Sequence, residues 1–104
     1  MKKILNAFSL NMVSAPAEIS VREISPEEAR SLAMAGVESA VGHADTAAVF
    51  SNQLGVAVPA NRVTVSLLKG DTVLVGQYKG PRLPEGATTL PAGATIQWLL
   101  VTVA

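Results

Sequence analysis

Apolar and polar residues alternate or recur along the chain in a way that predicts seven regular elements. Short runs, here of five to eight residues, rich in β-branched and other apolar side chains are typical of strands. The predicted strands are Ile4–Phe8, Ile19–Ile24, Arg62–Lys69, Val73–Tyr78 and Ile96–Val103. Between the second and third of these, apolar residues recur at helical spacing in two segments, which predicts two helices.

The first helix has a near-complete start signal. Ser25 suits the N-cap, Pro26 the first helical position, and Glu28 stands three residues after the cap, where its side chain can complete a capping box. The apolar pattern then continues to Gly36. Because acidic residues at a helix N-terminus favour the helix dipole, Glu27 and Glu28 are interpreted as structural and not catalytic.

The second helix begins within a residue or two of His43, the only histidine in the chain. Ala47, Phe50 and Leu54 recur at helical spacing after it, and Gly55 offers a stop. Backbone N–H groups at a helix start attract anions, and imidazole exchanges protons near neutral pH. From this segment alone, a simple helix-start histidine is the better interpretation, and a proton-transfer role beside a bound phosphate is the alternative.

Glycine and proline residues separate the later elements. Lys69–Thr72 resembles a hairpin turn leading into Val73–Tyr78, which predicts an antiparallel pair with Arg62–Lys69. Gly80–Gly86 is too rich in proline and glycine for regular structure. The predicted order is β-β-α-α-β-β-β, an α+β fold with a mixed five-stranded sheet, helices packed on one face and the other face open to a partner.

Length and composition limit the classes of function. The 104 residues form a single domain, 1–104, small enough that oligomerisation is plausible. Eight basic and eight acidic residues balance, so we expect no long nucleic acid as a partner. The absence of cysteine excludes disulfides, zinc ribbons and iron–sulfur clusters, and a single histidine excludes a histidine-rich metal site within one chain. We therefore expect no metal and no cofactor.

The N-terminus imitates a secretory signal peptide. Met1–Lys3 is basic, apolar residues follow, and Ala15–Ala17 resembles a cleavage site. Asn6, Ser9 and Asn11 interrupt the apolar region, so we reject that interpretation. No stretch approaches the roughly 20 apolar residues of a membrane span. We expect a cytoplasmic protein without a membrane partner, in the host cytoplasm if it is viral.

Six polar residues stand out because they lie in loops or at element ends, where sites are usually built. They come from three segments and are Asn6, Ser9, Asn11, His43, Arg82 and Glu85. Each is a weak signal alone: Asn6 can simply end a strand, and Arg82 can form an exposed pair with Glu85 that contributes little.

Four motifs together carry a family resemblance that covers almost the whole chain. Leu5–Met12, Gly42-His43, Asn61–Val63 and Arg82–Gly86, in this order and spacing, resemble the small viral anti-CRISPR ring nucleases of type III systems and their cellular relatives. The resemblance implies a homodimer with a mixed sheet and flanking helices. It also implies that cyclic tetra-adenylate binds across the dimer interface and is cut without metal, which removes the messenger that activates CRISPR ancillary nucleases.

The same resemblance assigns roles to individual residues. It implies that His43 is catalytic, that Arg82 and Glu85 complete the site, and that a further set contacts the ligand. That set is Asn6, Ser9, Asn11 and Gly42, with Arg82 contributing to binding as well.

The chemistry of metal-free RNA scission agrees with these roles. The 2′-hydroxyl must attack phosphorus in line with the leaving 5′-oxygen, which has to be protonated. His43 as imidazolium suits that protonation, a role worth roughly 10²- to 10⁴-fold. Arg82 can donate two hydrogen bonds to phosphate oxygens. Glu85 can hold the 2′-hydroxyl, accept its proton or orient Arg82.

One departure from the family and three alternatives remain. Ala87–Thr95 is short and broken by proline and glycine, where relatives often carry a segment able to form a helix, so the covering of the ligand is expected to differ.

The alternatives are a non-cleaving sponge for cyclic oligoadenylate, a dimeric nucleic-acid binder and a structural scaffold. A sponge needs no general acid, a nucleic-acid binder should be basic, and a scaffold gives the Arg82/Glu85 loop no role.

Overall fold

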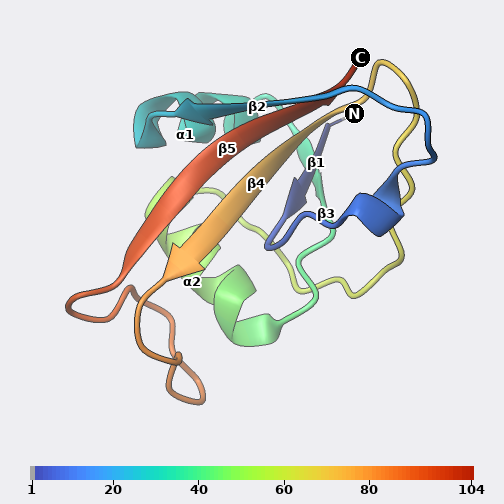
Figure 1. Ribbon diagram of the computed structural model, residues 1–104. Coiled ribbons are helices and arrows are strands. Elements are labelled where there is room, and N and C mark those ends of the chain that lie inside the picture. The colour runs from blue at the N-terminus through green and yellow to red at the C-terminus, as the bar shows by residue number, and fades with distance from the viewer. Residues whose placement is uncertain (1) are drawn as a thin grey trace.

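The computed structural model describes residues 2–104 and contains one mixed sheet in the order β2-β5-β4-β1-β3. β1 is parallel to both β3 and β4, whereas β5 is antiparallel to both β2 and β4. The strands are β1 (Lys2–Leu5), β2 (Ile19–Ile24), β3 (Val37–Ser39), β4 (Thr72–Lys79) and β5 (Thr95–Val103), shown in Figure 1.

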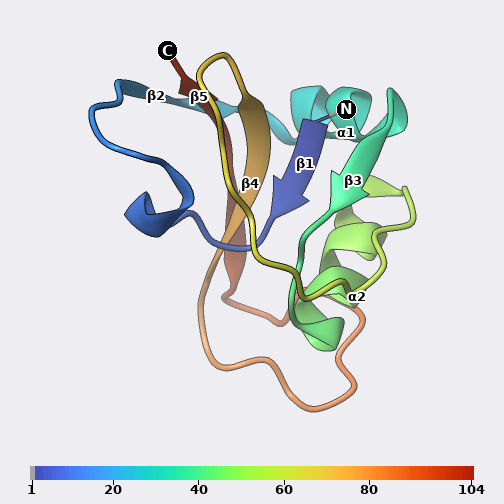
Figure 2. The ribbon, with the colours of Figure 1, turned by 90° about the vertical axis from the view of Figure 1, so that its right-hand side faces the viewer.

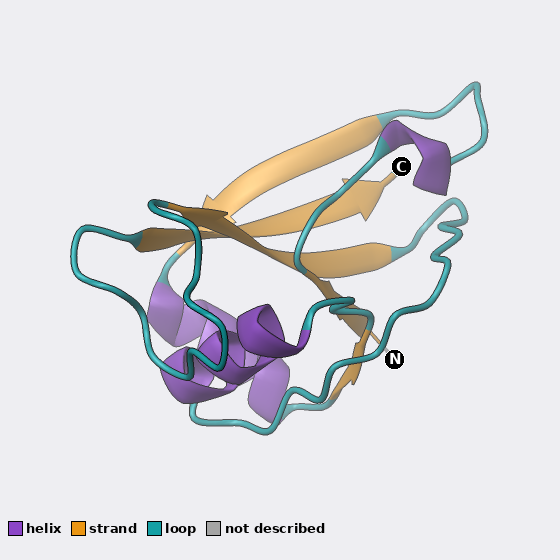
Figure 3. Cartoon of the chain, turned by 90° about the horizontal axis from the view of Figure 1, so that it is seen from below, coloured by secondary structure: helices purple, strands orange, loops and turns teal. Residues whose placement is uncertain are grey.

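Two α-helices, α1 (Pro26–Met34) and α2 (Ala44–Leu54), lie on one side of this sheet, and the short 3₁₀ helix η1 (Leu10–Met12) lies on the other (Figures 2 and 3). The predicted α+β class, the five-stranded mixed sheet and the helices on one face are confirmed.

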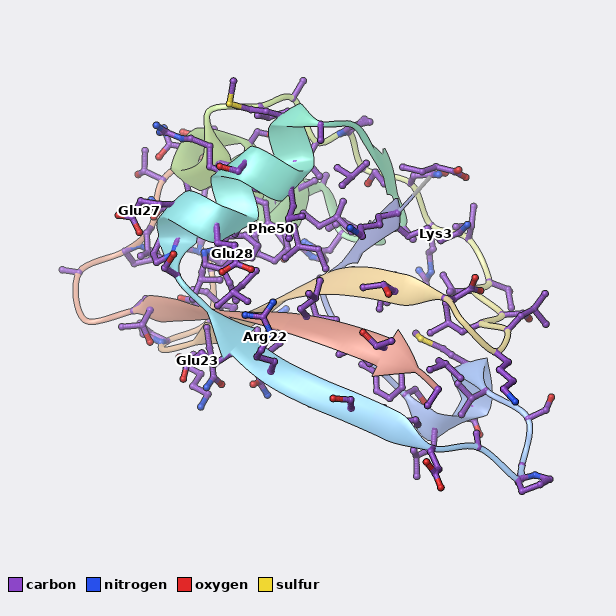
Figure 4. All side chains as sticks on the ribbon, turned by 90° about the horizontal axis from the view of Figure 1, so that it is seen from above. Lys3, Arg22, Glu23, Glu27, Glu28 and Phe50 are labelled. Atoms are coloured by element: carbon purple, nitrogen blue, oxygen red, sulfur yellow. The ribbon has the colours of Figure 1, made fainter. Side chains whose placement is uncertain are left out.

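Each face of the sheet has its own hydrophobic cluster. On the helical face, Phe50 of α2 packs against Trp98 of β5 with ring centroids 5.0 Å apart, and Ile4 of β1 joins them. Figure 4 shows Phe50 between the helical layer and the strands. On the opposite face, Leu5 packs with Val65 and Leu67 from the segment that precedes β4. The face predicted to be open is therefore partly covered by the chain itself.

The cap, proline and glycine residues occupy the helix ends predicted for them. The Ser25 hydroxyl accepts a hydrogen bond from the Glu28 N–H at 3.1 Å, and Pro26 occupies the first position of α1. α2 begins directly after His43, which is its N-cap residue, and ends at Gly55, whose φ of 68° is the left-handed conformation that favours glycine.

One predicted strand is wrong, and a short strand was missed. The segment 62–69 is extended but forms no part of the sheet, because both edges of β4 are already paired, with β1 and with β5. Its alternation is nevertheless real, since Val65 and Leu67 are buried against the sheet face. The fifth strand is β3, which follows α1, so the element order is β-β-α-β-α-β-β.

The bounds of the first strand and the connection into β4 also differ from the sequence prediction. β1 covers Lys2–Leu5 and not Ile4–Phe8, since its partners in β3 and β4 are paired only as far as Leu5, and Phe8 packs instead on the opposite face. The turn before β4 does form, with the Asp71 N–H donating to the Leu68 carbonyl at 2.9 Å. It connects an unpaired segment to β4 and is not a hairpin, and the antiparallel hairpin joins β4 to β5.

Among residues 2–104, no helix combines the length and apolar character that crossing a bilayer requires.

Gly76 of β4 allows the two aromatic rings of the core to meet. A Cβ at this position would lie 2.5 Å from Phe50 Cζ and 2.6 Å from Trp98 Cζ3, and rigid rings packed in a core cannot yield that much. We predict that Gly76→Ala lowers the free energy of unfolding by about 1–3 kcal/mol or more, measured by urea denaturation.

Gly42→Ala is the matched control for this substitution. A Cβ on Gly42 would lie 3.3 Å from Cγ of Arg62, the stem of an exposed and flexible side chain. It should cost clearly less than Gly76→Ala. Equal losses for the two variants would contradict the packing role of Gly76.

Candidate functional site

The candidate site lies where three parallel strands end. Asn6 follows β1 directly, His43 comes four residues after β3, and the loop 80–94 that carries Arg82 follows β4. Because β1, β3 and β4 are parallel, their carboxyl ends lie at the same edge of the sheet, as the strand directions in Figures 1 and 2 show. Ligands commonly bind beyond the carboxyl ends of parallel strands.

A pocket of about 510 Å³ is found at this edge. It brings together residues from all three strand ends and from the first turn of α2. The lining residues are Asn6, His43, Thr46, Tyr78, Gly80, Arg82 and Leu83. Three of the six polar residues singled out in the sequence, which lie up to 76 positions apart in the chain, are thus neighbours in space.

A second hollow of about 310 Å³ adjoins this pocket and shares Asn6, Thr46 and Tyr78 with it. Its remaining wall includes Phe8 and Gln77. The combined concave surface therefore offers apolar area next to a cation and a histidine, a combination that suits a ligand with both rings and phosphates.

A larger hollow, of about 650 Å³, lies elsewhere, at the opposite end of β5. It is lined by residues 13, 14, 16–18, 67–69, 103 and 104, and the ionisable side chains among them are Glu18 and Lys69. It contains no histidine or arginine, so the smaller pocket at the strand ends is the better candidate for phosphate chemistry.

Backbone and side-chain hydrogen bonds hold the segment between β3 and α2. The Ser39 hydroxyl donates to the Pro59 carbonyl at 2.6 Å and accepts from the Val41 N–H at 3.2 Å. Asn61 donates through its side-chain amide to the Ser39 carbonyl at 2.7 Å and through its backbone N–H to the Val41 carbonyl at 2.8 Å. These hydrogen bonds with Asn61 therefore fix the backbone segment that leads from β3 to His43.

His43 itself is exposed and makes no capping hydrogen bond, although it occupies the N-cap position of α2. Its imidazole therefore does not cap the helix. A helix-start role alone explains the backbone position of His43 but does not explain why the side chain is a histidine.

Arg62 lies next to the candidate site and is not one of the six polar residues chosen from the sequence. The stem of its side chain lies against Gly42, whose missing side chain makes room for it. The exposed Arg62 thus stands beside the residue that precedes His43, although it does not line the pocket. Its place in the Asn61–Val63 motif was the only sequence signal that could have found it.

The loop 80–94 is closed at its base. A Cβ on Gly80, whose φ is 150°, would lie 2.8 Å from Ala94 Cα, so the two ends of the loop touch. The Tyr78 hydroxyl donates to the Pro81 carbonyl, and the Ala87 N–H donates to the Pro84 carbonyl at 3.0 Å. Arg82 therefore extends from a constrained turn although the loop has no regular structure.

The remaining predicted residues lie outside the pocket. Glu85 is exposed and does not line it. Among residues 2–104 the one ion pair joins Arg22 to Glu28, whose side chains are labelled in Figure 4. Arg82 and Glu85 therefore do not form a surface pair. Ser9 accepts a hydrogen bond from the Asn11 N–H at 3.3 Å and so caps η1.

Within residues 2–104, no group of three or more histidine, aspartate or glutamate side chains is arranged to hold a metal ion. What the pocket offers is an imidazole, the Arg82 guanidinium and the Asn6 amide around one concavity. These groups can respectively transfer a proton, neutralise a phosphate and position a polar ligand atom.

A family model described as STIV B116-like matches residues 3–92. The chain belongs to the STIV B116-like family. The matched range contains all three strand ends and the whole pocket, while β5, which covers residues 95–103, lies beyond it.

Two viral relatives support membership of the STIV B116-like family. The uncharacterized protein ORF117 of Acidianus two-tailed virus is 34% identical over 86 residues, which cover 80% of this chain and 73% of ORF117. The solved structure of B116 of Sulfolobus turreted icosahedral virus superposes with a TM-score of 0.80 at 27% identity, covering 98% of this chain and 99% of B116. The fold described above is therefore that of a viral protein family.

Proposed function

We propose that this protein is a metal-independent ring nuclease that binds and opens cyclic tetra-adenylate, and so switches off the ancillary effectors of type III CRISPR systems in the cytoplasm. The observation that carries the proposal is the convergence of Asn6, His43 and Arg82 on one pocket at the ends of three parallel strands. The motif resemblance to ring nucleases supplies the identity of the substrate.

The proposed reaction is a phosphoryl transfer within the substrate. The ribose 2′-oxygen forms a bond to the adjacent phosphorus while the bond from phosphorus to the 5′-oxygen breaks. His43 as imidazolium gives its proton to the departing 5′-oxygen, and the 2′-hydroxyl proton passes to a base. The products are a 2′,3′-cyclic phosphate on one side of the cut and a free 5′-hydroxyl on the other.

Arg82 suits the phosphate because a guanidinium can donate two parallel hydrogen bonds to its oxygens. The stem of Arg62 lies against Gly42, the residue before His43. Glu85 stands three residues after Arg82 in the same loop and can take the 2′-hydroxyl proton, hold that hydroxyl or orient Arg82.

We further propose that the active form is a homodimer. A ring of four identical nucleotides has a two-fold axis, and a C₂ dimer presents the same pocket to each half of it. Such a ring extends beyond a single pocket, which gives exposed loop residues such as Ser9 and Asn11 a place in ligand contact.

The main competing function is a sponge that binds cyclic oligoadenylate without cutting it. The free imidazole of His43 in the pocket favours the nuclease, since a sponge has no need of a general acid. A nucleic-acid binder should carry an excess of basic residues, whereas this chain has a formal net charge of zero.

We predict that the wild-type protein opens cyclic tetra-adenylate in the presence of EDTA, and that His43→Ala binds the ring but cuts it at least about 100-fold more slowly, because proton transfer is lost while phosphate contacts remain. Single-turnover cleavage, followed by separation of the products, measures the rate, and calorimetry measures binding.

Gln53→Ala is the matched control, because Gln53 is exposed near the far end of the same helix and lies outside the pocket. It should cut as the wild type does. Near-unchanged cleavage by His43→Ala would disprove its role, and restoration of activity only by added divalent metal would disprove the metal-independent reaction. Tight binding without cleavage by the wild type would establish the sponge.

A site shared by two chains sets the stoichiometry of ring binding. We predict that calorimetry with the His43→Ala protein gives one cyclic tetra-adenylate per two chains, and that the ring stabilises the dimer in sedimentation experiments by linkage. One ring per chain, or an active monomer at working concentration, would contradict the shared site without contradicting the chemistry of His43.

A further inference from the structure

The loop that carries Arg82 and Glu85 is attached to the rest of the molecule on both sides of those residues. Before Arg82, the Tyr78 hydroxyl donates to the Pro81 carbonyl. After Glu85, the Gly86 N–H donates to the Asp45 carboxylate at 3.2 Å. The four residues from Arg82 to Glu85 are therefore bracketed by two hydrogen bonds from different elements.

The second of these bonds joins parts of the chain that are 41 residues apart. Asp45 is the second residue of α2, and His43 is the N-cap of the same helix. The bond thus connects the helix turn that begins at His43 directly to the loop that presents Arg82, as the adjacency of α2 and this loop in Figure 2 illustrates.

We propose that Asp45 is a positioning residue, which sets the distance between His43 and the Arg82/Glu85 loop through its hydrogen bond to Gly86. The inference rests on the proposed nuclease function but assigns Asp45 no contact with the substrate. A loop without regular structure samples many conformations unless it is held, and small displacements of a catalytic group can cost up to about 100-fold in rate.

An aspartate at this position also has an ordinary structural role, because a negative charge in the first turn favours the helix dipole. The chain contains a counterpart with that role alone. Glu27 is the second residue of α1 and is exposed, and its loss removes an acidic group from a first turn without touching the loop 80–94. Comparing the two positions separates dipole effects from positioning.

The test uses four full-length proteins: wild type, Asp45→Ala, Asp45→Asn and the control Glu27→Ala. Hydrogen exchange of the free proteins reports on the Gly86 amide and its neighbours in the loop. Single-turnover cleavage and equilibrium binding of cyclic tetra-adenylate then separate the rate of cutting from affinity. The asparagine variant keeps an oxygen acceptor but loses the negative charge.

We expect exchange at Gly86 to rise about fivefold or more in Asp45→Ala and to stay near wild type in the other two variants. Cleavage by Asp45→Ala should fall about 10- to 100-fold with binding changed less than about threefold, and Asp45→Asn should restore the rate to within about threefold of wild type.

Three results would overturn the inference. Unchanged exchange in Asp45→Ala would mean that the bond does not hold the loop. Faster exchange with unchanged cleavage would mean that holding the loop does not matter for the reaction. An asparagine variant as slow as the alanine variant would mean that Asp45 acts through its charge.

Failure of the proposed function is distinguishable from all three results. If the wild type cuts no cyclic oligoadenylate, the proposed nuclease falls and the catalytic role of Asp45 falls with it. The exchange measurement still decides whether Asp45 holds the loop, because it needs no substrate.

Discussion

The position of β1 between two parallel neighbours is the constraint on which the rest of the structure depends. This strand is only four residues long, yet it is hydrogen-bonded to β3 on one side and to β4 on the other. Its last two residues are fully buried, with Ile4 in the cluster beneath the helices and Leu5 in the cluster on the opposite face. A shift of β1 by one residue would exchange these two side chains and disturb both clusters at once.

The same register places the site. Because β1 is fixed against β3 and β4, the three chain segments that follow these strands emerge side by side, and each delivers one polar group to the pocket. Asn6 directly follows β1, whereas His43 and Arg82 depend on further contacts. The hydrogen bonds of Asn61 hold the segment that leads to His43. Those of Tyr78 and Asp45 hold the loop that carries Arg82. The sheet thus brings these three residues together, and side-chain hydrogen bonds position them more finely.

Local signals in the sequence predicted local structure well. Ser25 and Pro26 marked the start of α1, Gly55 marked the end of α2, and β2 begins and ends at the predicted residues, because each of these features depends on the chemistry of neighbouring positions. The segment 62–69 was mistaken for a strand since its burial alternates as in a strand, while pairing depends on whether a neighbouring edge is free. β3 has three residues, too few for a periodic pattern to be recognised.

The candidate site was predictable in part, because local sequence signals mark the ends of the elements. Polar residues at element ends identified Asn6, His43 and Arg82, which the fold brings into one pocket. Sequence spacing could not separate these from Ser9, whose hydroxyl caps η1. Nor could it reveal Asp45, because the relevance of Asp45 comes from a hydrogen bond with Gly86, which is distant along the chain.

The central claim is that His43 and Arg82 act together on one scissile phosphate. Single-turnover rates for wild type, His43→Ala, Arg82→Ala and the double variant, each saturated with cyclic tetra-adenylate, test it most directly. Groups that serve one transition state lose activity non-additively, so the double variant should be within about threefold of the slower single variant. Losses that multiply in the double variant would show two independent contributions and contradict the claim.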